Sequence, residues 1–202
     1  MSGALPTSPA FADIKITSIQ PTLTSRTISG KRQTRQVGGQ YWRIYATYPP
    51  MTRAQFDPIF GFLMKQRGSF ETFTFIPPVV SSTTATGYGT PVINGGSQTG
   101  RTVNTDGWTA NQSAGNLLQA GNYLKFANHS KVYVLTDANT SGSSGESTLS
   151  IEPALLTSPA DGSAITIASV PFTVYLMNSG LVEYNVDNSG LFYYDLDLCE
   201  AL

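Results

Sequence analysis

Apolar and polar residues alternate with a period of two along several short stretches of the chain, which is the pattern of half-buried β-strands. The clearest stretch is 41–47, whose inward residues are Trp42, Ile44 and Ala46. Residues 71–76 alternate in the same way, with Phe73 and Phe75 on the inward face. A Pro-Pro pair follows each stretch, and proline cannot donate a hydrogen bond to a sheet. The pattern therefore predicts a mainly β protein.

One segment, at about residues 53–67, has the spacing of an amphipathic helix instead. Its apolar face consists of Phe56, Ile59, Phe60 and Leu63. Thr52 can cap the amino end, with Gln55 three residues later as in a capping box. Pro58 leaves two starts open, because the helix can begin after Thr52 or begin again at Asp57 with proline in its first turn.

The composition changes after residue 78 and changes back near residue 168. Between these points the chain is rich in Ser, Thr, Gly and Asn, with recurrent Asn-Gly and Asp-Gly turn pairs between short strand candidates. We expect residues 79–167 to form an inserted small antiparallel β-barrel or sandwich. Its expected core includes Leu124, Val132, Val134, Leu149 and Ile151. Residues 1–78 and 168–202 are expected to form one discontinuous β-rich core around the helix, with strands from both parts in one sheet system.

The charge is sparse and unevenly distributed. Only 12% of the 202 residues are charged, against roughly 25% in an average soluble protein. Residues 1–67 hold nine Lys and Arg against two Asp, whereas residues 68–202 hold three Lys and Arg against eleven acids, so the two regions carry +7 and −8. Two interpretations stay open: the regions neutralise each other within one folded unit, or each faces a different partner. The net charge of −1 excludes strong overall attraction to nucleic acid or to an anionic membrane.

Residues suited to catalysis or metal binding are few. A single cysteine and a single histidine exclude an internal disulfide, a Cys-based zinc site and any site with two imidazoles. We expect Cys199 to be a buried thiol and His129 to be a surface residue in a hairpin turn. Asp195 and Asp197 share a strand face and could support a metal-assisted hydrolase, but a solvated strand face is favoured. No catalytic, cofactor-binding or metal-binding residue is predicted, and the protein is not expected to be an enzyme or to need a cofactor.

No run of residues approaches the roughly 18 apolar positions of a membrane span, and the first 20 residues lack the pattern of a signal peptide. No membrane anchor is expected.

A more specific arrangement surrounds the helix. A segment with Ser29-Gly30 and nearby basic residues precedes the strand Gly39-Gln40-Tyr41-Trp42-Arg43. A Pro-Pro break follows, and then a helix that ends in Phe60-Gly61-Phe62-Leu63-Met64-Lys65-Gln66-Arg67-Gly68 and leads into an aromatic strand at 70–75. Taken together, over residues 25–78 and 115–200, the chain resembles the distal tail proteins of long-tailed bacteriophages and of phage-derived gene transfer particles. In that family an Arg-Gly turn and an aromatic strand follow the single helix.

The resemblance implies a structural virion protein of the tail tip, made in the cytoplasm of the host bacterium. Six copies would form a ring that joins the tail tube to hub, baseplate or tail-fibre proteins, and genomic DNA would pass through the ring without being read. The fold implied is a ring-forming β-sandwich or barrel core that carries an inserted barrel. From the charge distribution we add that Lys31, Arg32 and Arg35 could form a basic surface facing the acidic part of the next copy.

A binding module is the alternative function. The inserted domain would then hold a host-surface glycan or receptor, with aromatic side chains as a stacking platform. The candidate residues for this platform are Tyr88, Trp108 and Tyr123.

Overall fold

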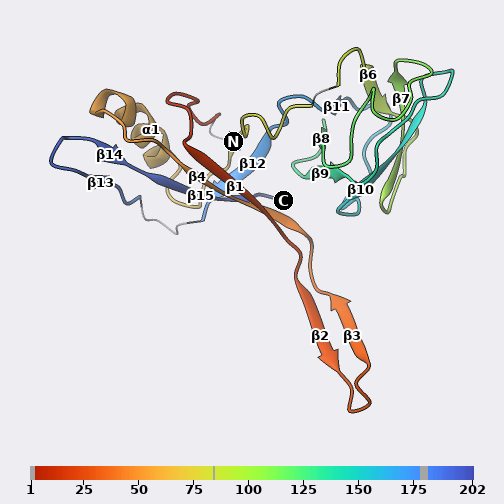
Figure 1. Ribbon diagram of the computed structural model, residues 1–202, viewed down its shortest axis with the longest axis horizontal. Coiled ribbons are helices and arrows are strands. Elements are labelled where there is room, and N and C mark those ends of the chain that lie inside the picture. Colours follow the sequence, from red (N-terminus) through yellow and green to blue (C-terminus); the bar gives the residue numbers. More distant parts are fainter. Residues whose placement is uncertain (1–2, 84, 178–181) are drawn as a thin grey trace. The chain divides into compact units, whose positions relative to one another are not determined.

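A computed structural model describes residues 3–83, 85–177 and 182–202. The chain divides into two compact units (Figure 1). Unit 1 comprises Met1–Thr74 and Thr173–Leu202, and unit 2 comprises Phe75–Phe172. The described residues contain one helix, and most of the remaining regular structure is antiparallel sheet. The predicted mainly β fold with one principal helix is therefore confirmed.

A five-stranded sheet, interleaved from distant parts of the sequence, organises unit 1. Its order is β1 (Asp13–Ile19), β4 (Tyr41–Thr47), β15 (Asp195–Glu200), β12 (Phe172–Leu176) and β5 (Phe73–Phe75). β4 is antiparallel to both neighbours, with Ile44 opposite Ile16 and Leu198. Trp42, Ile44 and Ala46 are buried, as their alternation predicts, while Tyr45 and Thr47 on the other face are exposed.

The helix α1 (Arg53–Lys65) is continuous through Pro58. It has a single start at Thr52, whose backbone N–H donates to Gln55 Oε1 at 3.0 Å. Phe56, Ile59 and Leu63 are buried, because these residues lie on one face of the helix. The ring of Phe62 packs edge-on against Phe73 of β5, with centroids 5.3 Å apart, so the helix packs against the edge strand of the sheet.

Two short hairpins complete unit 1. One consists of β2 (Thr22–Arg26) and β3 (Arg32–Gln36), and it extends from the adjoining ends of β1 and β4 (Figure 1). The other consists of β13 (Asn185–Val186) and β14 (Phe192–Tyr193). An isolated bridge between Met51 and Phe192 attaches it beyond the other end of β4.

Unit 2 is a six-stranded sheet that nearly closes on itself. Its order is β11 (Ile165–Thr166), β8 (Tyr123–Phe126), β9 (Val132–Leu135), β10 (Ser147–Glu152), β7 (Thr102–Trp108) and β6 (Gly89–Ile93). A bridge between Val92 and Ala164, with the Ile93 N–H donating to the Ser163 carbonyl at 3.0 Å, brings the two edges together. The predicted small antiparallel barrel is thus confirmed.

The core of unit 2 differs from the prediction in β9. Leu124, Leu149 and Ile151 belong to the core cluster as expected, and Val132 is fully buried, but Val134 is only half-buried. Tyr133 and Leu135 of the same strand fill the core instead. Val134 was therefore a wrong assignment, because side chains one residue apart on a strand point to opposite faces.

Candidate functional site

The β2–β3 hairpin is a highly exposed element of unit 1. Every residue of both strands is exposed. The Thr27 N–H donates to the Lys31 carbonyl at 3.0 Å and closes the turn, which presents a fully exposed Ile28 to solvent. A two-stranded hairpin by itself is only marginally stable in water. Its length and exposure are typical of an element that contacts a partner.

The charge of this hairpin is entirely positive, because residues 20–40 contain four cations and no acid. Arg26 lies directly opposite Arg32 in the strand register. Arg35 lies opposite Leu23 on the other face, so both faces are cationic. No ion pair in the described ranges involves these residues or Lys31.

The basic surface proposed from the sequence, Lys31, Arg32 and Arg35, therefore lies on a projecting hairpin. A hollow of about 520 Å³ runs along it, lined by Leu23, Thr24, Ser25, Gln33, Thr34 and Arg35. The hollow combines an apolar side chain, hydroxyl and amide groups, and one guanidinium. Such a lining can accept a partner surface that is both acidic and apolar.

The β13–β14 hairpin has the opposite character. Residues 182–202 contain five acids and no Lys or Arg. The carboxylate of Asp187 accepts hydrogen bonds from the backbone N–H groups of Ser189 and Leu191 and from the Tyr193 hydroxyl, at 2.8, 2.9 and 3.1 Å. The bond from the Leu191 N–H contributes most to holding the pKa of Asp187 below its ordinary value. The hairpin thus presents a stable negative charge beside the exposed side chains of Tyr184, Val186 and Tyr193.

This acidic hairpin is not among the sites expected from the sequence. It consists of two separate two-residue strands, and the next strand, β15, begins at Asp195. The available signal was the string Asp187-Asn188-Ser189-Gly190, which is a strong turn sequence.

Asp195 and Asp197 have different surroundings in the structure. Asp197 is bound by Arg43 of β4, from Nε to Oδ1 at 3.0 Å and from Nη2 to Oδ2 at 2.7 Å. This hydrogen bonding raises the pKa of Arg43. Asp195 is exposed and lies opposite Thr47. Within the described ranges, no group of three His, Cys, Asp or Glu side chains is arranged to hold a metal ion.

The three aromatic residues considered for glycan stacking have separate roles in unit 2. Trp108 is 4% exposed and belongs to the core, where its Nε1 donates to Thr105 Oγ1 at 2.8 Å. Tyr88 is half-buried and packs on the same core. Tyr123 lies on β8, half-buried, with its ring edge-on to Phe172 at 5.6 Å between centroids. The indole of Trp108 is a packing group and not a face open to a sugar.

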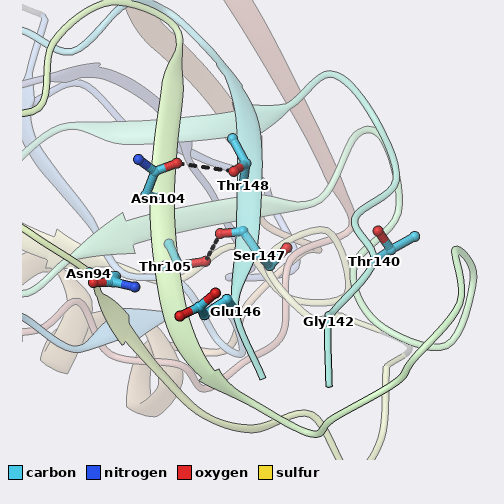
Figure 2. A pocket seen from close by; sticks show the side chains of 8 residues that line it. All are labelled: Asn94, Asn104, Thr105, Thr140, Gly142, Glu146, Ser147 and Thr148. Carbon is cyan, nitrogen blue, oxygen red and sulfur yellow. Dashed lines mark hydrogen bonds between the residues drawn. The ribbon is translucent and has the colours of Figure 1, made fainter. Parts of the chain in front are cut away.

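A polar hollow of about 550 Å³ lies on unit 2 (Figure 2). It lies over β7, β10 and the segment that leads into β10. Its lining residues are Asn94, Asn104, Thr105, Thr140, Gly142, Glu146, Ser147 and Thr148. Thr148 Oγ1 donates to Asn104 Oδ1 at 3.0 Å, and Thr105 Oγ1 donates to the Ser147 carbonyl at 2.8 Å. The only signal of this hollow in the sequence is the general richness of the segment in Ser, Thr and Asn.

The sequence predicts a buried thiol at Cys199 and a surface turn residue at His129. Cys199 is buried, as expected. His129 follows the turn after β8, as expected, and its side chain is half-buried rather than fully exposed. Its Nδ1 lies 3.1 Å from the Tyr133 hydroxyl, its ring is edge-on to Phe126, and its Nε2 is buried. Burial lowers the pKa of His129 below its ordinary value.

One part of the chain matches a known protein family. Residues 83–170 match the family model of the B domain of distal tail protein pb9. This segment coincides with most of unit 2. A search of curated proteins finds no match. The resemblance to phage distal tail proteins is therefore supported, and it rests on the barrel of unit 2.

Within the described ranges, no helix has the length and apolar character that a membrane crossing requires.

Proposed function

We propose that this protein is a structural component of the tail tip of a long-tailed bacteriophage and is located in the virion. The observation that carries this proposal is the match of residues 83–170 to the B domain of a distal tail protein. The proposed role is structural and non-enzymatic. The pairing of Asp197 with Arg43 supports it, because that contact occupies one of the two carboxylates considered for catalysis.

In the finer form of the proposal, six copies form a ring between the tail tube and the hub, baseplate or tail-fibre proteins. Genomic DNA passes through the ring without sequence-specific contacts. Residues 1–78 and 168–202 are the ring-forming part, and residues 79–167 are an inserted domain. The pairing of β4 with β15 supports this division, because it joins the two sequence segments in one sheet.

Antibody labelling of purified tailed particles tests the function. A phage that encodes this chain is imaged by electron microscopy with an antibody raised against the purified protein. Label confined to the distal end of the tail is the expected result. Label along the tube, on the capsid or on no particle would contradict the proposal. Averaged images of the labelled layer then show whether its symmetry is sixfold.

Glycan binding by unit 2 is a second candidate function, and the polar hollow favours it. Amide, hydroxyl and carboxylate groups of Asn94, Asn104, Thr140 and Glu146 line this hollow, and such groups hydrogen-bond sugar hydroxyls. A glycan array probed with the full chain and with Asn104→Ala tests it. Binding that Asn104→Ala abolishes supports a glycan site in the hollow. Absence of binding, or binding that the substitution leaves unchanged, excludes this site.

A further inference from the structure

The two hairpins of unit 1 emerge from opposite ends of β4. Tyr41 at the start of β4 pairs with Ile19, and β2–β3 connects these two ends. Thr47 at the other end pairs with Asp195, which lies just after β14. β4 has seven residues and so spans roughly 20 Å at about 3.3 Å per residue. The β2–β3 hairpin of one copy therefore points away from the β13–β14 hairpin of the same copy (Figure 1).

The two hairpins are complementary in charge and in apolar content. The first carries Arg26, Lys31, Arg32 and Arg35 together with Leu23, which is 66% exposed. The second carries Glu183 and Asp187, with Asp195 following it. Its exposed apolar side chains are those of Tyr184, Val186 and Tyr193. The two surfaces carry opposite charges and therefore attract each other. Both also expose apolar side chains, whose burial in a contact is favourable.

We propose that the β2–β3 hairpin of one copy docks on the β13–β14 surface of the next copy, defined as Glu183–Val186 with Asp187, Phe192, Tyr193 and Asp195. This inference rests on the proposed function, because a ring requires contacts between different surfaces of successive copies. Two unlike patches that cannot meet within one copy generate a head-to-tail contact, and such contacts close into a ring when the rotation allows it.

The composition of the hairpin favours contact with a partner surface. Arg26 and Arg32 face each other across the strands, and like charges in this position destabilise an isolated hairpin. An anionic surface turns this repulsion into two favourable contacts. Leu23 and Ile28 lose their exposure to water in the same step. The same contacts weaken as salt is added, because exposed charges are screened.

Charge reversal on both sides gives a direct test with the full chain. One variant carries Arg32→Glu and Arg35→Glu, and the other carries Glu183→Lys and Asp195→Lys. All four side chains are exposed, so both variants are expected to keep the fold, which circular dichroism and thermal unfolding verify. Sedimentation velocity and native mass spectrometry measure assembly across the micromolar range. A control variant, Lys15→Glu with Lys65→Glu, makes the same change in net charge as the first variant at positions outside both hairpins.

Each reversed variant alone should assemble at least about tenfold more weakly than the wild type, because one hairpin then loses its original net charge and each reversed position meets a like charge on the next copy. An equimolar mixture of the two should regain assembly with alternating copies, since each reversed position then again meets an opposite charge. The control should assemble as the wild type does. A wild type that stays monomeric, variants that assemble normally, or a mixture that does not recover would each overturn the docking.

The test of the hairpin contact and the test of the proposed function can fail independently of each other. Protein found at the tail tip, together with a mixture that does not recover, overturns the hairpin contact and leaves the function standing. A recovered mixture of a protein that is absent from tail tips overturns the function and leaves the contact standing.

Discussion

Arg43 of β4 and Asp197 of β15 form a two-pronged ion pair, although 154 residues separate them in the sequence. The guanidinium also lies over the ring of Tyr45, 4.7 Å from its centroid. The pair joins the two adjacent strands that come from the two sequence segments of unit 1. It is partly shielded, since 16% of the Asp197 side chain is exposed. Such a bidentate pair is stronger than an ordinary surface pair.

Arg43→Ala should lower the free energy of unfolding by about 1–2 kcal/mol, because it leaves a partly buried carboxylate without its main partner. Chemical denaturation of the full chain measures the change. Arg53→Ala is the matched control, since its pair with Asp57 is exposed on both sides and should contribute less than about 0.5 kcal/mol. Equal effects of the two substitutions would contradict a special role for the Arg43 pair.

Leu63→Ala should cost roughly 2–5 kcal/mol of stability, because Leu63 is fully buried on the inner face of α1 and the substitution leaves a cavity. Met64→Ala is the control one residue further along the helix, where the side chain is 56% exposed. Its effect should stay within about 0.5 kcal/mol. A loss below about 0.5 kcal/mol for Leu63→Ala would show that this face does not contribute to the core.

Gly107→Ala should destabilise unit 2 severely, by at least about 3 kcal/mol. Gly107 has a φ of 75°, and an added Cβ would overlap the carbonyl oxygen of Thr90 on the neighbouring strand β6. Two causes contribute at Gly107: the left-handed backbone and the steric overlap of the added Cβ. Gly100→Ala isolates the first cause, because Gly100 has a φ of 87° but open space around it. It should cost only about 1–2 kcal/mol, the strain of a left-handed backbone. Thermal unfolding compares the variants, and similar losses would argue against the steric cause.

The stability of unit 2 should fall as the pH is lowered through about 6.5. The pKa of His129 is below its ordinary value in the folded state, chiefly because burial disfavours the imidazolium ion. The unfolded chain therefore binds the proton more readily, and stability is lost as the pH falls from the unfolded value toward the folded one. Urea titrations at pH 7.5 and pH 5.5 of the wild type and of His129→Gln measure this. An identical pH dependence in the variant would show that His129 is not responsible.

Replacing residues 80–168 by a short Gly-Ser linker should leave a chain that still folds cooperatively. The remaining residues hold the paired strands β1, β4, β15 and β12, and closing a loop of different length changes the entropy little. Circular dichroism and a cooperative thermal transition test the expectation. An unfolded product would show that the segment proposed as an insertion is needed for the fold of unit 1.

Much of the local structure could be predicted because it depends only on neighbouring residues. The alternation around Trp42, Ile44 and Ala46 is sufficient to define a strand and its buried face. The spacing of Phe56, Ile59 and Leu63 is sufficient to define a helix and its inner side. The Asn-Gly and Asp-Gly pairs between short apolar runs were sufficient to indicate a small antiparallel barrel.

Other features depend on which distant residues meet. The inward face of β9 is the one with Tyr133 and Leu135, because the register with β8 and β10 decides it and Val132 to Leu135 are all apolar. His129 is half-buried because its ring packs on Phe126 and Tyr133 across the hairpin.

The sequence by itself determined the strand periodicity, the single helix, the turn positions and the separation of charge along the chain. These properties follow from residue types within a few positions of one another. The tertiary structure decided that Asp197 is bound by Arg43, that Trp108 is a core residue, and that a basic and an acidic hairpin emerge from opposite ends of β4. These facts depend on the order and register of strands far apart in sequence, which local patterns do not specify.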